Sequence, residues 1–381
     1  MKIAFWCFSG LILFIYFLFP IIIFIIAKIK GRDPQQSDIA PFVSFIIALH
    51  NEEKVIREKL KNTLSLDYPQ DRLEIIFALD GCTDKTKEII SECGNGRIRI
   101  LDNKQRRGKV ATLNRVVGEA KGEIVVFSDA NSIHQKDTLR KLIRNFSDQK
   151  VGCVCGRLKY TGADSTSVGK GESLYWRYEH FVKTQESKLG KLLITNGSIQ
   201  ALRKHLYPYP DPEIADDFSV PLLIQARGYK ILYEPQAVVY ETATQSLKEE
   251  FRQKVRIVSQ GIKGAIRLRK DLLRLRALGL FELLFHKLLR WFIPFFLIAV
   301  FAFNLTLVQD KLYFYLFILQ LIFYFFAFIG FLLQYSNKIK VFYIPFYFCL
   351  VNFASLVAFF WLLSGGETRM WEKAYSTRSN K

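Results

Sequence analysis

The sequence VSFIIALHNEE at residues 43–53 carries the strongest structural signal in this chain, and LEIIFALDGCTD at residues 73–84 shows the same pattern. Each stretch begins with a short, mostly apolar run and ends in polar and acidic residues. Continuous apolar runs of this length, rich in Ile, Val and Phe, are typical of strands that are buried on both faces of a parallel sheet. Between the two runs, apolar residues recur at helical spacing from residue 55 to residue 64.

The alternation of strand and helix continues along the chain. Further short apolar runs follow at Arg97–Leu101, Glu123–Ser128 and Val151–Cys155, and residues 85–93 can form a second connecting helix. Strands that alternate with helices at this interval favour a parallel sheet with helices packed on it. We therefore predict an α/β domain built on a mostly parallel sheet flanked by helices.

Polar residues directly follow three of the predicted strands, at His50–Glu53, Asp80–Asp84 and Ser128–Asn131. In an open parallel sheet, ligands bind beyond the carboxyl ends of the strands. Taken singly, Asn51 or Asp84 could be a helix cap, and Asp80 could belong to a plain turn. Together, however, the acidic groups would repel one another unless a cation or a donor-rich ligand lies between them. The sequence therefore predicts a ligand site at this edge of the sheet.

The composition excludes several classes of protein. Half of the 381 residues are hydrophobic, which excludes a disordered chain because such chains lack apolar surface to bury. Lys and Arg number 54 and Asp and Glu 35, so the net charge is 54 − 35 = +19. This charge is concentrated beside apolar segments and no nucleic-acid-binding motif accompanies it, so we predict no nucleic-acid partner. A phosphate-loop NTPase is excluded because no Gly-x-x-x-x-Gly-Lys-Ser/Thr sequence occurs.

Uncharged stretches at both ends of the chain predict membrane helices. Residues 3–27 carry no charge, and a helix of that length spans ~37 Å, more than the ~30 Å hydrocarbon core of a bilayer. Three more uncharged stretches follow at residues 291–309, 312–337 and 341–366. Lys28, Lys30 and Arg32 flank the first span on one side and only Lys2 on the other, which predicts that the middle of the chain faces the cytoplasm. We expect an integral protein of a bacterial-type inner membrane.

The C-terminal tail conflicts with a simple count of crossings. Three complete spans after a cytoplasmic domain place residues 369–381 outside, yet this tail carries four Lys or Arg residues, which favour the cytoplasm. Two alternatives stay open: either the last stretch, which contains Pro345, does not cross completely, or the tail departs from the positive-inside tendency.

These patterns divide the chain into five regions. Between Gln245 and Arg290 there are 12 Lys or Arg against 4 Asp or Glu, interspersed with leucines, which favours helices that lie on the anionic lipids of the cytoplasmic leaflet. We predict an N-terminal transmembrane anchor at 1–28, a cytoplasmic α/β domain at 29–245, basic amphipathic interfacial helices at 246–290, transmembrane segments at 291–366 and a basic tail at 367–381.

Seven motifs in order resemble those of the family-2 nucleotide-sugar glycosyltransferases, which have the GT-A fold. They are Ala48–Glu53, Asp80–Thr86, Gly108–Asn114, Ser128–Asn131, Thr195–Ser198 with Ala201–Arg203, Ala215–Asp217 and Gln253–Arg256. Any one motif is weak, but their order and spacing together are specific. The resemblance is closest to the membrane-attached group that includes the cellulose, hyaluronan and poly-N-acetylglucosamine synthases.

The resemblance implies an inverting hexosyltransferase-like enzyme of the EC 2.4 class, which moves a sugar from a nucleotide-diphosphate donor, expected to be a UDP-sugar, to a hydroxyl of a glycan or lipid-linked acceptor. Asp217 is the expected base, because the acceptor hydroxyl needs a carboxylate to take its proton. Asp216, Arg256 and Gln253 complete the expected catalytic group. The expected nucleotide-binding residues are Glu52, Asp80, Asp84, Lys109 and Asp129. Asp129 and Asn131 are the expected ligands of Mg²⁺ or Mn²⁺, because only oxygen ligands are available there.

Three positions depart from the family pattern. Asn131 replaces the second Asp of Asp-x-Asp, which should lower the affinity for metal. Ile257 stands where Trp follows Gln-x-x-Arg, which removes an aromatic surface on which an acceptor sugar could stack. Asp216 stands where Glu precedes the catalytic Asp, a conservative change. The first two departures keep an alternative open, in which the chain is a catalytically inactive nucleotide-sugar sensor or an assembly subunit of a polysaccharide machine.

Overall fold

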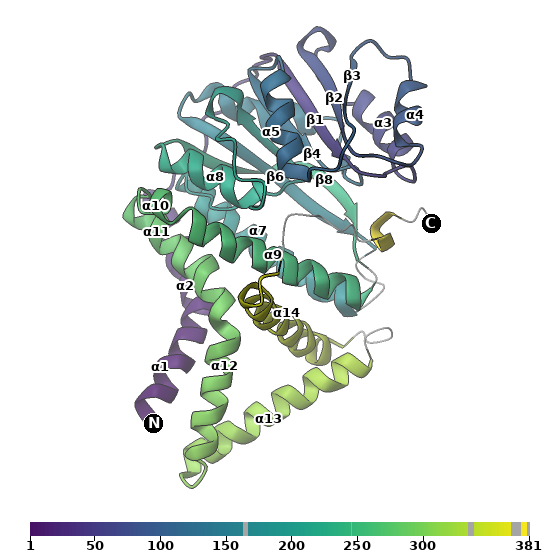
Figure 1. Cartoon of the computed structure of the whole chain (residues 1–381). Coiled ribbons are helices and arrows are strands. Elements are labelled where there is room, and N and C mark those ends of the chain that lie inside the picture. Colours follow the sequence, from purple (N-terminus) through teal and green to yellow (C-terminus); the bar gives the residue numbers. More distant parts are fainter. Residues whose placement is uncertain (163–166, 245, 334–338, 367–374, 379–381) are drawn as a thin grey trace.

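A mixed eight-stranded sheet forms the centre of the soluble part (Figure 1). The computed structural model describes residues 1–162, 167–244, 246–333, 339–366 and 375–378. Within those residues the strands lie in the order β3-β2-β1-β4-β7-β6-β8-β5. Their bounds are β1 Val43–Leu49, β2 Leu73–Asp80, β3 Ile98–Asn103, β4 Ile124–Ser128, β5 Ile133–His134, β6 Val151–Thr161, β7 Gln200–Arg203 and β8 Lys230–Thr242.

The first four strands confirm the predicted parallel arrangement. β1 pairs in parallel with β2 and β4, and β2 pairs in parallel with β3. Val43 lies opposite both Leu73 and Ile124, so the three central strands start level with one another. Their carboxyl ends therefore meet at one edge, where the predicted ligand residues follow them.

The other half of the sheet departs from an all-parallel arrangement. β7 runs antiparallel to both β4 and β6, and β5 runs antiparallel to β8. β8 pairs with β6 in parallel, with a register shift between the pairs Gly156 to Glu234 and Arg157 to Val238. Pro235 lies in that irregularity, which suits a residue that cannot donate a ladder hydrogen bond.

Helices cover both faces of the sheet, because alternate strand residues point to opposite sides. Phe45 and Ile47 pack with residues of α3 and α6, whereas Ile46 and Phe127 pack with residues of α5 and α8. These helices, together with the short α4, span α3 Ile56–Leu64, α4 Thr86–Ser91, α5 Lys109–Glu119, α6 Thr138–Ile143 and α8 Asp216–Ala226.

Two longer helices lie between the sheet and the apolar helices below it (Figure 1). α7, Ser167–Lys188, contacts β8 on one side and α2 and α14 on the other. α9, Leu247–Arg267, carries the predicted Gln253 and Arg256, and it packs along α14. Two short helices follow it, α10 Arg269–Leu272 and α11 Ala277–Glu282.

Four helical stretches among the described residues are long and apolar enough to cross a membrane, which indicates an integral membrane protein. They are Lys2–Lys30, Ala277–Thr306, Lys311–Leu332 and Lys340–Leu363. The first contains α1 Lys2–Leu13 and α2 Phe19–Lys30, the second ends in α12 Leu289–Thr306, and the last two are α13 and α14. The prediction of one N-terminal and three C-terminal membrane helices is therefore confirmed at the level of length and composition.

The last of these helices lies against the soluble domain. Ala354 and Ala358 of α14 pack on Val255 and Val258 of α9, and the Tyr347 hydroxyl donates a hydrogen bond to Glu250. Beyond α14, the short helix η7, Tyr375–Arg378, lies on the soluble domain as well (Figure 1). A third complete crossing would put η7 on the far side of the bilayer. Of the two alternatives for the tail, the structure therefore favours an incomplete crossing by α14.

Candidate active site

The Lys109 side chain joins two predicted carboxylates from separate segments. Lys109 is the first residue of α5, and its Nζ lies 2.7 Å from Oδ1 of Asp129, which follows β4. The same Nζ lies 3.9 Å from Oδ2 of Asp216, the first residue of α8. Three residues that are 20 and 87 positions apart in the chain thus meet at the edge predicted from the strand ends.

Charge keeps this group ionised although it is largely buried. Burial pushes the pKa of the Asp129 carboxyl upward, but Lys109, together with the charges of Arg378 and Lys59, outweighs this effect, and the net pKa lies below the usual value. Burial likewise opposes the charge on Lys109, yet Asp129 and Asp216 raise its pKa above the usual value. At neutral pH Lys109 and Asp129 therefore form an ammonium–carboxylate pair.

Asp217 lies next to this group in the first turn of α8, where the positive end of the helix dipole favours a carboxylate. Its backbone carbonyl accepts hydrogen bonds from the N–H and the hydroxyl of Thr195. Burial raises the pKa of the Asp217 carboxyl to about 6, with a further contribution from Asp216 and opposition from Lys109 and other cations. A carboxylate whose pKa lies near the working pH suits general base catalysis.

Arg256 approaches the same carboxylates from α9. Burial lowers the pKa of its guanidinium, and the negative charges of Asp217 and Asp129 act in the opposite direction. Gln253 lies on the same helix, three residues earlier. Ile257, at the position of the missing Trp, is 46% exposed.

Asp80 is 4% exposed and binds the turn that precedes Lys109. Its carboxylate accepts hydrogen bonds from the N–H groups of Arg107 (2.7 Å) and Gly108 (2.9 Å) and from the Thr112 hydroxyl (3.0 Å). Gly108 has φ +92°, a conformation that favours glycine. Asp80 therefore fixes the start of α5, and with it the position of Lys109. Its predicted contact with a nucleotide stays a prediction.

Two other predicted nucleotide-binding residues already have protein partners. Both carboxylate oxygens of Glu52 accept hydrogen bonds from Nε of Arg378, at 3.0 and 2.7 Å. Asp84 accepts hydrogen bonds from the N–H and hydroxyl of Thr86 and from the N–H of Glu53. Asp84 thus binds Thr86, the first residue of α4, whereas the N-cap position itself is occupied by Lys85. The expected roles of Glu52 and Asp84 in nucleotide binding stay predictions.

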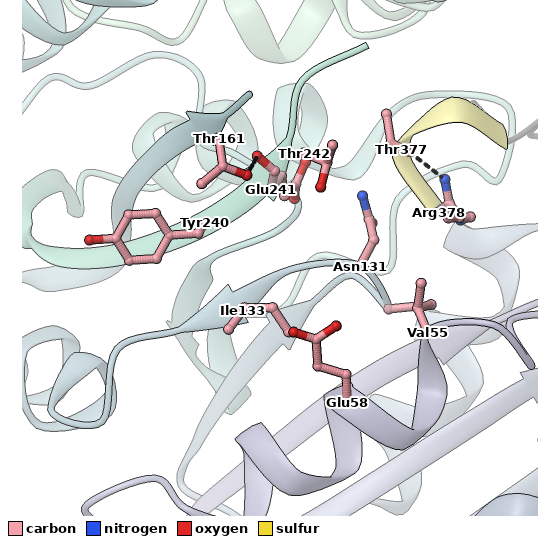
Figure 2. A pocket seen from close by; sticks show the side chains of 11 residues that line it. Val55, Glu58, Asn131, Ile133, Thr161, Tyr240, Glu241, Thr242, Thr377 and Arg378 are labelled. Atoms are coloured by element: carbon pink, nitrogen blue, oxygen red, sulfur yellow. Dashed lines mark hydrogen bonds between the residues drawn. The ribbon is translucent and has the colours of Figure 1, made fainter. Parts of the chain in front are cut away.

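Asn131 lines a cavity of about 310 Å³ between the end of β8, the start of α3 and η7 (Figure 2). Figure 2 shows the Asn131 side chain between Glu241 on one side and Arg378 on the other. The other lining residues are Val55, Glu58, Ala130, Ile133, Thr161, Tyr240, Thr242 and Thr377. The two expected metal ligands thus lie at one turn, with Asp129 held by Lys109 and Asn131 beside this cavity.

The donor set at this turn fits a divalent cation shared with a ligand. Across the described ranges, no group of three or more His, Cys, Asp or Glu side chains is arranged to hold a metal ion. Asp129 and Asn131 offer only one carboxylate and one amide oxygen, and Oδ2 of Asp216 is buried without a hydrogen-bond partner among the described residues. Mg²⁺ commonly takes one or two carboxylates and completes its shell with water and substrate phosphates.

Several residues near the site escaped the sequence predictions. Lys183 of α7 is buried and lowers the pKa of Asp217. Lys59 of α3 is buried under the turn that carries Asp129. Arg378 entered the sequence analysis only as part of the basic tail at 367–381, without a role in the site. An isolated Lys within an amphipathic helix gives no signal for such a role.

Gly197 provides a test of the contact between Lys109 and its two carboxylates. A Cβ added at residue 197 would lie 2.8 Å from Nζ of Lys109 and 3.6 Å from Oδ2 of Asp216. Because the end of a lysine side chain can move, Gly197→Ala should leave the thermal midpoint within a few degrees of wild type. It should displace Lys109 and lower nucleotide-diphosphate affinity by ~10-fold, about 1.4 kcal/mol. Calorimetric titration measures the affinity and a thermal melt the midpoint, and unchanged affinity would contradict the expected role of Lys109 in nucleotide binding.

Comparisons with known proteins bear on the family and the fold of this chain. Residues 44–208 match the model of glycosyl transferase family 2. A probable glycosyltransferase of Bacillus subtilis is 28% identical over 57% of this chain and 54% of its own length. The poly-β-1,6-N-acetyl-D-glucosamine synthase of Staphylococcus aureus is 28% identical over 65% of this chain and 61% of its own length. The match therefore spans little more than half of each relative.

A solved structure supports the fold independently. The structure of a mannosyltransferase from Pyrobaculum calidifontis in complex with GDP-Man and Mn²⁺ superposes with a TM-score of 0.66, at 21% identity. The match covers 93% of this chain and 99% of that one, so it includes the membrane helices as well as the sheet. Residues 44–208 thus form a glycosyltransferase family 2 domain, and the chain is a distant relative of the poly-β-1,6-N-acetyl-D-glucosamine synthases.

Proposed function

We propose that this chain is an inverting transferase that moves a sugar from a nucleotide-diphosphate donor to a hydroxyl of a glycan or lipid-linked acceptor, in polysaccharide synthesis. The observation that carries the proposal is the meeting of Lys109 with Asp129 and Asp216 directly beside Asp217. This arrangement provides a cation, a metal-binding carboxylate and a base for one reaction. The relatives support the reaction class, and UDP is the expected nucleotide because of the resemblance to the polymer synthases.

The donor's diphosphate needs positive charge as it leaves. Arg256 is the expected partner for the phosphate oxygens, because a guanidinium matches them in a bidentate fork. Lys109 is within reach of the same region through its contact with Asp129. A divalent cation at Asp129 and Asn131 would neutralise part of the charge on the diphosphate. The Mn²⁺ in the mannosyltransferase structure supports this assignment.

The acceptor hydroxyl needs a base. In the proposed step, the Asp217 carboxylate takes the hydroxyl proton, and the hydroxyl oxygen forms the new bond to the anomeric carbon. The bond from that carbon to the diphosphate breaks, and the nucleotide diphosphate leaves with the electron pair. Attack from the face opposite the leaving group inverts the anomeric carbon, so no covalent glycosyl-enzyme is required.

The membrane helices favour an acceptor that is held at or near the bilayer. α9 carries Gln253 and Arg256 on a helix that also packs along α14, so the acceptor side of the site is next to the apolar helices. The basic residues Lys28, Lys30 and Arg32 after the first span support a cytoplasmic site.

The rate is expected to fall in acid. A base must be ionised, and the Asp217 carboxyl, with its pKa raised to about 6, is protonated below that value. The value of kcat/KM should therefore be level above pH ~7 and should decline by ~10-fold per unit below pH ~6. Initial rates between pH 5 and 8, with the thermal midpoint followed in parallel, test this. A flat profile over that range would remove Asp217 as the base.

Release of nucleotide diphosphate by the purified full chain tests the function as a whole. The probes are a panel of UDP- and GDP-sugars with Mg²⁺ or Mn²⁺, in lipid nanodiscs that contain a crude glycan and lipid acceptor fraction. Release above that of the Asp217→Asn variant supports the transferase. Nucleotide binding without release from any donor supports the inactive sensor or assembly subunit instead.

A further inference from the structure

Lys59 lies under the turn that carries the expected metal ligands. It is the fourth residue of α3, and its side chain is completely buried. Its Nζ donates one hydrogen bond to the Ser128 hydroxyl and one to the Ser132 carbonyl, both at 2.6 Å. These two partners bracket the segment Asp129-Ala130-Asn131. One ammonium group therefore holds the turn at both of its ends.

Apart from Lys59, few contacts connect the two ends of the turn at residues 128–132. The Ser128 hydroxyl also lies 2.8 Å from Nε2 of His134, and the Ser132 hydroxyl donates to Glu241. Across the turn itself, the Ser132 N–H reaches the Asp129 carbonyl at 3.4 Å, a long hydrogen bond. Among the described contacts, only Lys59 binds residues 128 and 132 together.

The surroundings of Lys59 are unfavourable for a charge. Its Nζ lies 5.6 Å from the centre of the Phe45 ring, and it forms no ion pair with any residue that the structure describes. Burial lowers the pKa of Lys59 to about 7, with Asp129 and Glu241 opposing the shift. A buried ammonium without a carboxylate partner costs folding free energy. Lys59 is therefore poorly explained as a residue that stabilises the fold.

We propose that Lys59 is a positioning residue, which holds the turn so that Asp129 and Asn131 can receive the divalent cation and the diphosphate of the donor. The inference rests on the proposed function. Lys59 does not touch the donor: it acts through Ser128 and the Ser132 carbonyl. Residues that orient metal ligands from behind commonly change metal affinity or activity by ~10- to 100-fold when they are removed.

The test compares Lys59→Met with wild type in the full chain in nanodiscs. Met retains most of the buried volume but neither the charge nor the hydrogen bonds. Affinity for UDP and GDP is measured by calorimetry with Mn²⁺ and again with a chelator. We expect the gain in affinity that Mn²⁺ provides to fall by ~10-fold or more, as for other residues behind metal ligands. The affinity of Lys59→Met measured with the chelator should be close to that of wild type, and its thermal midpoint should equal or exceed that of wild type.

Two further variants make the result specific. Lys61→Met, which removes an exposed lysine on the same helix, should match wild type in every measurement. Ser128→Ala, which removes one of the two partners of Lys59, should lower the Mn²⁺-dependent gain in the same direction and keeps the test decisive if Lys59→Met does not fold.

The outcomes separate the two claims. A wild-type chain that binds neither nucleotide overturns the proposed function, and the inference with it. If wild type binds with Mn²⁺ but Lys59→Met and Ser128→Ala keep the full Mn²⁺-dependent gain, the inference alone fails. A lower thermal midpoint with equal losses in Mn²⁺ and in chelator would show a purely structural role, which also overturns it.

Discussion

Asp217→Asn is expected to lower the turnover number by ~10²- to 10⁴-fold, the usual contribution of a positioned base, while leaving nucleotide-diphosphate affinity nearly unchanged. The amide has almost the shape of the carboxylate, so the start of α8 should keep its structure. It cannot take the proton of the acceptor hydroxyl. The neighbouring Asp216 carboxylate should not substitute, because it faces Lys109 at 3.9 Å.

Single-turnover and steady-state assays of nucleotide release measure the turnover number, and calorimetry measures the nucleotide-diphosphate affinity. Asp71→Asn is a suitable control, because Asp71 lies just before the start of β2, at the far end of that strand from Asp80, and its side chain is 80% exposed. It should retain the wild-type rate. A rate for Asp217→Asn within a factor of about three of wild type would assign the base to another residue.

Asp129→Ala is expected to abolish the part of nucleotide-diphosphate affinity that depends on Mg²⁺ or Mn²⁺. Asp129 supplies the single carboxylate of the expected ligand pair, and a hard cation needs such oxygen ligands. The change also removes the closest partner of Lys109. Titrations with and without metal should therefore give the same affinity in the variant and different affinities in wild type.

Asn131→Asp is the matched counterpart, because it adds a carboxylate at the same turn without changing the size of the side chain. It should strengthen the dependence on metal, since a charged ligand replaces a neutral one. If Asp129→Ala retains the wild-type difference between titrations with and without metal, the cation is held elsewhere.

The parallel half of the fold could be predicted because each of its strands is a separate apolar run. β1 and β4 have the bounds of the sequence pattern within one residue, and the polar residues after them meet at one edge as expected. In the other half only β6 was predicted from an apolar run, at Val151–Cys155, and β8 was not. β8 contains Pro235 next to Gln236 in the middle of the strand, and the irregular pairing with β6 that accommodates them depends on contacts distant in sequence.

Residues of the site could be predicted where the proposed chemistry needs a particular residue type. Contacts that depend on how distant segments pack together could not. Lys109, Asp129 and Asp217 were expected from the family resemblance, and the structure brings them close together, while their roles stay predictions. The partners of Asp80 were not expected, since its contacts with Arg107 and Gly108 depend on how a loop closes over β2. Lys59 escaped for the same reason: its role depends on the turn above it, which is 69 positions further along the chain.

The structure of the full chain in nanodiscs with Mn²⁺ and the nucleotide diphosphate that binds it most tightly is the most direct test of the shared site. We expect the metal on the Asp129 carboxylate, the diphosphate between Arg256 and Lys109, and the Asp217 carboxylate open to the side from which an acceptor would enter. A nucleotide bound in another cavity, with the contact between Lys109 and Asp129 unchanged, would contradict the account.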